Sequence, residues 1–215
     1  REEIEKAMEV YEKNKCLVIS DEIWSDLTLE GYKHIPTQSV NEYAHEHTFA
    51  FYAPSKTFNL AGLVGSYHIV YNSYLRDRLM ETEKCSHYNS ANVLSISALM
   101  GAYTMEGAEW VDELREVLTQ NVDYAYTYIT THFEGVSVAK AQGTYMLYLD
   151  CSGWLKAHPE MTMDDLIRAG IAVGVVWQDG RPFMNLNTIR MNLAVPHALV
   201  KEAMDRLDKY VFNAK

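Results

Sequence analysis

The sequence has few cysteines, few basic residues and no apolar run long enough to span a bilayer. Its three cysteines, Cys16, Cys85 and Cys151, are odd in number and far apart, a spacing that suggests neither a disulfide framework nor a zinc site. The 19 Lys and Arg residues are outnumbered by 29 Asp and Glu residues, and the formal net charge is -10. Such a surface repels nucleic-acid phosphates and anionic membranes. We therefore expect a protein of the reducing cytoplasm that binds neither nucleic acid nor a membrane.

Apolar residues are nevertheless plentiful. They make up 48% of the 215 residues, enough for the core of one large domain or two small ones. The charged opening residues predict an amphipathic helix with Ile4, Ala7, Met8 and Tyr11 on one face. This helix starts without a capping residue or an initiating methionine. We expect the chain to begin inside a longer protein.

Short apolar segments near the start predict three strands of an α/β sheet, over residues 16–20, 48–53 and 67–71. Asp21 directly follows the first strand. Lys56 follows the second, within the turn 54–57. Because open α/β sheets bind their ligands at the carboxyl ends of the strands, we predict a functional site there.

The rest of the chain predicts a different organisation. Residues 73–99 look mostly helical, and residues 108–133 form a long amphipathic helix that could bridge two domains. Beyond it, strands are expected over 136–138, 144–149 and 189–193, and helices over 163–169 and 197–212. We therefore assign residues 1–107 to a large domain that includes the start of the interdomain helix, and residues 108–215 to a small α+β domain.

Three motifs lie in these segments: Ser20-Asp-Glu-Ile-Trp-Ser-Asp26, Ala53-Pro-Ser-Lys-Thr-Phe-Asn-Leu-Ala-Gly-Leu63 and Ile189-Arg-Met-Asn-Leu-Ala-Val-Pro196. Their composition, order and separation resemble the fold-type-I pyridoxal-phosphate (PLP) enzymes of the aminotransferase class I/II superfamily, and especially the cystathionine β-lyase-like branch. The resemblance covers nearly the whole chain. It implies the aspartate-aminotransferase fold, with the carboxyl-terminal part of the large PLP-binding α/β domain followed by the small α+β domain. It also implies PLP as the cofactor and a homodimer for the full-length protein.

Lys56 and Asp21 carry the chemistry that this resemblance implies. A lysine amine can hold the cofactor covalently and can move protons once the substrate displaces it. Lys56 matches the family's lysine, whereas a lone lysine in a loop is usually solvated. Asp21 matches the carboxylate that keeps the pyridine nitrogen of the cofactor protonated. The alternative role for Asp21 is to cap the turn after its strand.

Neighbouring positions depart in part from the family pattern. Trp24 stands where aminotransferases have tyrosine and the β-lyase-like branch has histidine. An indole donates one hydrogen bond and accepts none, so the contact with the cofactor is altered, or Trp24 has a packing role alone. Ser55 matches a serine that donates to the cofactor phosphate, with stabilisation of the turn as the alternative. Val64 replaces an arginine that many aminotransferases place on that phosphate, a departure shared with the β-lyase-like branch.

Arg190 matches the arginine that binds the substrate α-carboxylate through two parallel hydrogen bonds. Its alternative role is that of a surface arginine on an edge strand. We interpret Glu22 as a solvated charge and Asp26 as a loop residue. The run His45-Glu-His47 is interpreted as a solvated, loop-like stretch without a third ligand nearby, and no metal site is predicted.

The full-length protein is therefore expected to be a PLP-dependent enzyme acting on a small amino acid. The first hypothesis is a C–S β-lyase that releases a thiol, pyruvate and ammonia, and the second is an aminotransferase. Both would use Lys56, Asp21 and Arg190 in the same way. Val64 and the lysine motif favour the lyase, whereas Trp24 fits neither pattern. A third hypothesis is a non-catalytic regulatory module with this fold.

Overall fold

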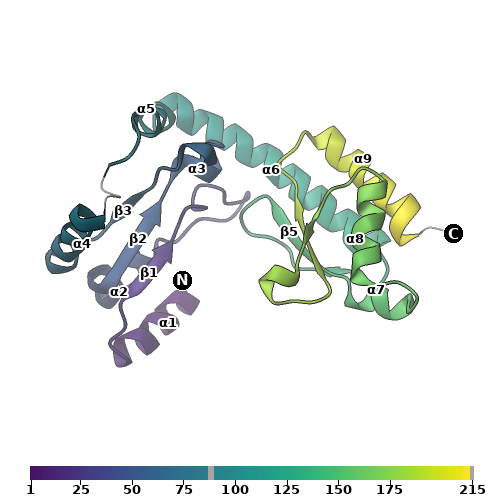
Figure 1. The fold of residues 1–215 in the computed structure, drawn as a ribbon, viewed down its shortest axis with the longest axis horizontal. Helices are drawn as coiled ribbons and strands as arrows, with labels where there is room; N and C mark the ends of the chain where they lie inside the picture. The colour runs from purple at the N-terminus through teal and green to yellow at the C-terminus, as the bar shows by residue number, and fades with distance from the viewer. Residues whose placement is uncertain (87–89, 214–215) are drawn as a thin grey trace. The chain divides into compact units, whose positions relative to one another are not determined.

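The computed structural model describes residues 1–86 and 90–213 (Figure 1). The chain forms two compact units, Arg1–Glu113 and Leu114–Lys215. The division lies inside a long helix, α6 (Met105–His132). Each unit contains its own sheet.

The sheet of the first unit has the order β1-β2-β3, with β1 (Val18–Asp21), β2 (Thr48–Tyr52) and β3 (Tyr67–Ile69). β1 and β2 run parallel, with Val18 opposite Thr48 and Asp21 opposite Phe51, whereas β3 is antiparallel to β2. β-branched and aromatic residues dominate β1 and β2 because their side chains pack well on a pleated surface. Since β1 and β2 are parallel, both chains leave the sheet at the same edge, and the residues that follow each strand meet there.

Two helices cover one face of this sheet, α1 (Glu2–Lys13) and α2 (Glu42–His47). The core beneath them contains Met8, Val40 and Ala44, surrounded by Ile4, Val18 and Ile35. Two residues after the end of α1 lies a left-handed residue, Lys15, with a φ of 53°. The next amide, that of Cys16, donates to the carbonyl of Tyr11 at 2.9 Å, the hydrogen bond that closes a Schellman motif.

The prediction of a solvated loop at His45-Glu-His47 is wrong, because these residues end helix α2. The side chain of Asn41 accepts a hydrogen bond from the amide of Ala44 at 2.8 Å and so caps the helix. Both histidine rings then stack on tyrosines, His47 on Tyr43 and His45 on Tyr71, with ring centroids 4.0 and 4.1 Å apart. The capping asparagine is the sequence signal that could have identified this helix.

The remaining helices of the first unit follow β2 and β3. They are α3 (Pro54–Thr57), α4 (Ser73–Ser86) and α5 (Val93–Ala102), with short 3-10 turns η1 (Thr37–Ser39) and η2 (Ala61–Leu63). The predicted helical stretch 73–99 therefore corresponds to two helices. Residues 87–89 of that prediction lie outside the described residues.

The sheet of the second unit has the order β4-β5-β7-β6 and is antiparallel throughout. Its strands are β4 (Ser137–Val138), β5 (Met146–Asp150), β6 (Gln178–Asp179) and β7 (Thr188–Asn192). Ile189 and Met191 of β7 are buried, and Arg190 alternates with them on the other face. β7 pairs with strands on both sides, so the edge-strand alternative for Arg190 is wrong.

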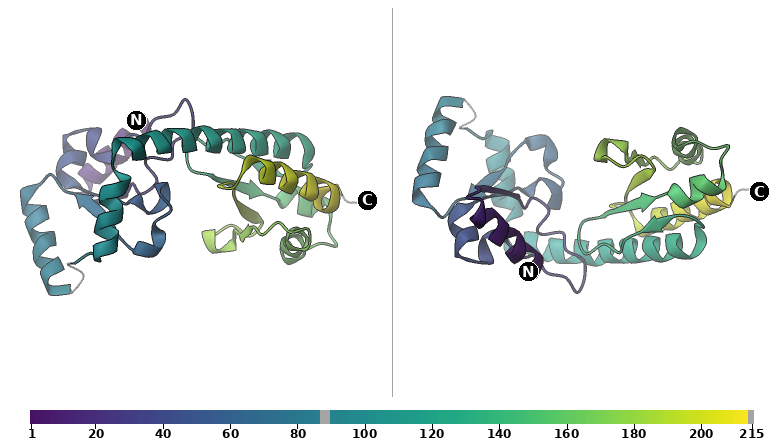
Figure 2. Two further views of the ribbon diagram at one scale, coloured as in Figure 1. Left: turned by 90° about the horizontal axis from the view of Figure 1, so that it is seen from above. Right: turned by 90° about the horizontal axis from the view of Figure 1, so that it is seen from below.

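The second unit also contains helices. They are the second half of α6, α7 (Ser152–Ala157), α8 (Met163–Ala172) and α9 (His197–Leu207). α9 continues into a π-helical turn, η4 (Asp208–Phe212). A 3-10 turn, η3 (Arg181–Phe183), follows β6. α9 lies beside α6 in both directions of view (Figures 1 and 2), and the hydroxyl of Tyr128 donates to Asp205 at 3.0 Å. Asn121 of α6 is fully buried and donates to the carbonyls of Leu193 and Val195, which fixes the chain leaving β7. Over residues 1–86 and 90–213, no helix has both the length and the apolar character needed to cross a membrane.

Candidate active site

Lys56 lies in α3, the single helical turn that directly follows β2. Pro54 begins this turn, where its fixed φ suits the first helical position and its missing amide hydrogen is not needed. Lys56 and Ser55 are both partly buried. The Nζ atom of Lys56 lies 5.5 Å from the ring centroid of Trp24, which follows β1. The parallel strands thus bring two of the predicted site residues together, in a cation–π arrangement.

Asp21 is the last residue of β1, and its side chain is exposed in this chain. Its Oδ1 atom accepts a hydrogen bond from the amide of Ile23 at 3.2 Å. This contact is the turn-capping role that the sequence analysis gave as the alternative. It involves one of the two carboxylate oxygens, so it is compatible with a second partner on the other.

Glu22 corrects the sequence analysis, because it is buried and not solvated. The residue is 4% exposed, and its amide donates to the carbonyl of Phe51 at 2.8 Å, which extends the pairing of β1 with β2. The carboxylate has four partners on three segments: Ser20 Oγ at 3.0 Å, His34 Nε2 at 2.6 Å, the Thr37 amide at 3.0 Å and Tyr52 OH at 2.9 Å. Strand alternation could have shown this, since Glu22 continues the inward face of Val18 and Ser20.

These hydrogen bonds decide the charge of the Glu22 carboxyl group. Burial raises its pKa, but the bonds from His34, the Thr37 amide, Tyr52 and Ser20 together outweigh burial, and the pKa lies below its ordinary value of 4.5. Burial and the bond to Glu22 raise the pKa of Tyr52, so its phenol stays a donor. Glu22 is therefore a buried carboxylate that accepts all four hydrogen bonds, because a carboxylate has no hydrogen to donate.

Asp26 also has a partner that the sequence analysis did not identify. Its Oδ2 atom accepts a hydrogen bond from Thr57 Oγ1 at 2.9 Å. Thr57 is 1% exposed and directly follows Lys56. Asp26 lies in a turn, as predicted, yet its carboxylate is tied to the helix that carries the lysine.

Val64, the position of the predicted departure from the family, has an unusual backbone. It is 85% exposed and lies in the left-handed region, with φ 51° and ψ 55°. A β-branched residue in this region is strained, because its Cβ substituents crowd the backbone. The residue ends the 3-10 turn η2.

Arg190 points away from the core of the second unit and has contacts on two sides. Its guanidinium carbon lies 4.8 Å from the ring centroid of Phe183, and Nη2 donates to Gln178 Oε1. A pocket of about 200 Å³ opens here, lined by Met146, Val176, Trp177, Gln178, Arg190 and Asn192. The pocket therefore has one cation and two amide side chains among its lining residues.

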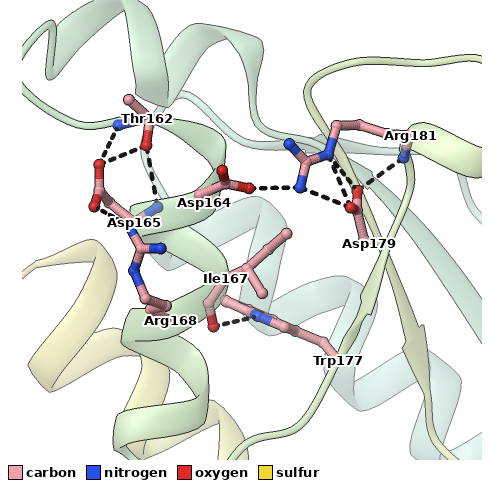
Figure 3. Close-up of polar contacts among 8 residues, drawn as sticks. All are labelled: Thr162, Asp164, Asp165, Ile167, Arg168, Trp177, Asp179 and Arg181. Atoms are coloured by element: carbon pink, nitrogen blue, oxygen red, sulfur yellow. Dashed lines mark hydrogen bonds and ion pairs between the residues drawn. The ribbon is translucent and has the colours of Figure 1, made fainter.

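The strand that carries Gln178 is attached to α8 by polar contacts, some exposed and one partly buried (Figure 3). Arg181 pairs with Asp179 at 2.8 Å and reaches Asp164 on α8 at 2.5 Å. The indole of Trp177 donates to the carbonyl of Ile167 at 3.3 Å. Gly170 makes this approach possible, because a Cβ there would lie 2.4 Å from the Trp177 ring.

Lys56, Ser55, Trp24 and Asp21 belong to the first unit and Arg190 to the second. Their predicted roles toward a cofactor and a substrate stay predictions. Within the part of the chain that the structure describes, no three His, Cys, Asp or Glu side chains gather as metal ligands would.

An α/β unit with a lysine after one parallel strand and a carboxylate after its neighbour, followed by an antiparallel α+β unit, is the architecture that the sequence motifs predicted. Comparison with known proteins shows which family has this architecture. Residues 1–207 match the family described as "Aminotransferase class I and II", and the chain belongs to that family. The predicted resemblance and fold are confirmed.

Within this family, the chain is similar to both lyases and aminotransferases. The chain is 30% identical over 190 residues to cystathionine beta-lyase PatB of Bacillus subtilis, covering 87% of this chain and 49% of that protein. It is 24% identical over 213 residues to an aspartate aminotransferase of Bacillus sp. (strain YM-2), covering 98% and 53%. Among solved structures, cystalysin from Treponema denticola, which contains a pyridoxal 5'-phosphate cofactor, matches with a TM-score of 0.87 and 27% identity, over 100% of this chain and 54% of that one. The chain spans about half the length of the relatives it matches.

Proposed function

We propose that the full-length protein is a PLP-dependent amino-acid enzyme and, more narrowly, a C–S β-lyase. The observation that carries the proposal is the group of Lys56, Trp24 and Asp21 at the carboxyl ends of two parallel strands, in a member of the class I and II aminotransferase family. The likeness to cystathionine beta-lyase PatB and to cystalysin supports the lyase. The likeness to aspartate aminotransferase keeps transamination as the second hypothesis.

The side chains present fit such a cofactor. Bound PLP supplies an electron-withdrawing ring that acidifies the Cα–H bond of an amino-acid substrate. The amine of Lys56 would hold the cofactor covalently and then move the Cα proton. The carboxylate of Asp21 would favour the protonated pyridine nitrogen, and the Ser55 hydroxyl would donate to the phosphate.

Arg190 would bind the α-carboxylate of the substrate. A guanidinium matches a carboxylate with two parallel hydrogen bonds, and the contact with Phe183 holds the guanidinium plane while leaving other donor groups for the substrate. Gln178 is already bonded to Nη2, so the substrate would share or replace that acceptor. The small pocket beside Arg190 suits a small polar ligand.

Val64 and Trp24 bear on the reaction type. An aminotransferase must retain its aminated cofactor between two half-reactions, whereas a lyase restores the lysine-bound form in each cycle. Without an arginine at Val64 the phosphate would have one charge-assisted contact fewer, which would harm an aminotransferase more. The indole of Trp24 cannot accept or transfer a proton, so Lys56 is left as the proton carrier of this group.

We also propose a homodimer and a cytoplasmic location for the full-length protein. α5 exposes Val93, Leu94 and Met100, apolar side chains that favour a covered surface in the complete protein. Cys16, Cys85 and Cys151 are all free thiols, which suits a reducing compartment.

The reaction type is tested with the full-length protein and PLP. Given L-cystathionine, it should release a thiol, pyruvate and ammonia faster than it transfers an amino group from any amino acid to 2-oxoglutarate. Lys56→Ala should lose both activities. Predominant glutamate formation would reverse the ranking, and a full-length protein that neither binds PLP nor turns over an amino acid would favour the regulatory module.

A further inference from the structure

Three side-chain contacts join the residues after β1 to the residues that end β2 and form α3. Tyr52 donates to Glu22 at 2.9 Å, the Trp24 ring lies 5.5 Å from Lys56 Nζ, and Thr57 donates to Asp26 at 2.9 Å. The two carboxylates thus lie on either side of the Trp24–Lys56 contact along both segments. They tie down the chain just before and just after the lysine.

The carboxylate of Glu22 is buried, and both of its oxygens already accept two hydrogen bonds. Each oxygen takes two partners, Oε1 the Ser20 hydroxyl and the Thr37 amide, and Oε2 His34 and Tyr52. Hydrogen bonds to a charged acceptor are stronger than neutral ones, and burial increases the difference. In Glu22→Gln an NH₂ group would replace one carboxylate oxygen, so the two partners on that side would have to accept a hydrogen bond or lose it, and the charge of the acceptor would be gone.

The Asp26 contact stabilises a helix that is too short to hold itself. α3 is a single turn, Pro54–Thr57, and one turn is unstable without tertiary contacts. The buried hydroxyl of Thr57 points at Asp26, which fixes the rotation of the turn about its axis and hence the direction of the neighbouring Lys56 side chain.

We propose that Glu22 and Asp26 are positioning residues that hold the amine of Lys56 at a fixed place relative to the carboxylate of Asp21. The inference rests on the proposed function, in which Lys56 and Asp21 contact the same cofactor. Glu22 is the residue next to Asp21, and its bond to Tyr52 ends β2, so one side chain sets both strand ends. Asp26 then sets the turn that follows.

The test uses the full-length protein with Glu22→Gln, Asp26→Asn and the milder Tyr52→Phe, at a temperature where each variant is folded. Hydrogen exchange without cofactor should show faster exchange of the amides of Phe58 and Leu60, whose acceptors lie in α3, by about tenfold. With PLP, borohydride reduction and peptide mapping should find less cofactor on Lys56. Turnover should fall by about tenfold to a hundredfold with KM changed less than about threefold, because misplacement of about 1 Å can cost 10²-fold.

Two matched controls separate positioning from loss of stability or charge. Gln38→Ala removes one buried and one partly buried hydrogen bond, to the carbonyls of Thr48 and Ile69, away from the end of β2 that leads to Lys56. Glu46→Gln removes a carboxylate that also has a histidine and an amide partner, but at the surface. Both should leave α3 exchange, Lys56 labelling and kcat unchanged.

The outcomes distinguish this inference from the proposed function. If Glu22→Gln and Asp26→Asn change exchange, labelling and kcat no more than Gln38→Ala does, the two carboxylates are structural only and the inference is wrong. If unsubstituted protein carries its cofactor on another lysine, the proposed function fails. The exchange measurement needs no cofactor, so it still decides whether the carboxylates hold α3.

Discussion

The surroundings of Lys56 and of Arg190 are held by different kinds of contact. Near Lys56, the carboxylate of Glu22 is buried and has four partners from three segments. Near Arg190, Gln178 and Phe183 are supported by the ion pairs of Arg181, whose side chain is 39% exposed. A buried polar group left without its partner is costly, whereas exposed ion pairs are screened by solvent and salt. We therefore expect the first group to depend on single side chains and the second to tolerate their loss.

The largest expected difference concerns the two site residues themselves. Lys56→Ala should remove the near-visible absorbance of the lysine-bound cofactor and lower turnover by at least about 10⁴-fold, as loss of a covalent catalytic group does. Arg190→Ala should keep the absorbance and mainly raise KM, by about tenfold to a hundredfold, because it removes a substrate contact. Absorbance spectra and steady-state kinetics of the full-length variants check both. An Arg190→Ala protein that loses the cofactor absorbance would contradict the assignment of cofactor binding to Lys56 and substrate binding to Arg190.

The next largest effect concerns Glu22 and pH. Glu22→Gln should lower the free energy of unfolding by about 2 kcal/mol near neutral pH, because four buried or partly buried donors lose a charged acceptor. The folded-state pKa of Glu22 lies below its ordinary value of 4.5, so the stabilisation is complete above that value and is lost as the pH falls through the folded-state pKa. The difference between wild type and Glu22→Gln should therefore shrink below about pH 4.5.

Denaturant unfolding of the full-length protein between pH 7 and pH 3 measures this difference. Glu46→Gln is the matched control, since Glu46 also bonds a histidine and an amide but is partly exposed, and it should change the unfolding free energy much less. A difference between wild type and Glu22→Gln that stays constant down to pH 3 would show that the Glu22 carboxylate is not held in its charged form.

The two regions also differ in how far sequence predicts them. The strands predicted over residues 16–20 and 48–53 lie within two residues of β1 and β2, and Lys56 follows the second as predicted, because apolar periodicity and motif order are local properties of the chain. The contacts of Glu22 were missed, since His34, Thr37 and Tyr52 lie 12, 15 and 30 residues away and meet it only after the strands pair. A motif identified Arg190, but it could not show that β7 is an interior strand. That follows from its pairing with β6, a two-residue strand without periodicity.

The smallest expected effect belongs to Arg181. Arg181→Gln should raise KM for the amino-acid substrate by no more than about threefold and lower Tm by no more than about 1 °C, because its ion pairs are exposed. The loss of Asp164 and Asp179 as partners would loosen β6, while Trp177 still holds that strand to α8 through Ile167. Raising the salt concentration should make the differences in KM and Tm between Arg181→Gln and the unsubstituted protein smaller still, since exposed ion pairs are screened by salt.

Arg168→Gln provides the control for Arg181, because Arg168 also lies near α8's acidic residues but pairs with Asp165 of its own helix and does not reach β6 (Figure 3). Both substitutions remove one positive charge from the same surface, so a general electrostatic effect on an anionic substrate would change KM equally in both. A contact that supports Gln178 would change KM in Arg181→Gln alone. If Arg181→Gln raised KM tenfold or more while Arg168→Gln did not, exposed ion pairs would control Arg190 as tightly as the carboxylates of Glu22 and Asp26 are expected to control Lys56. The contrast between the two regions would then fail, because exposure alone would no longer predict which contacts the site depends on.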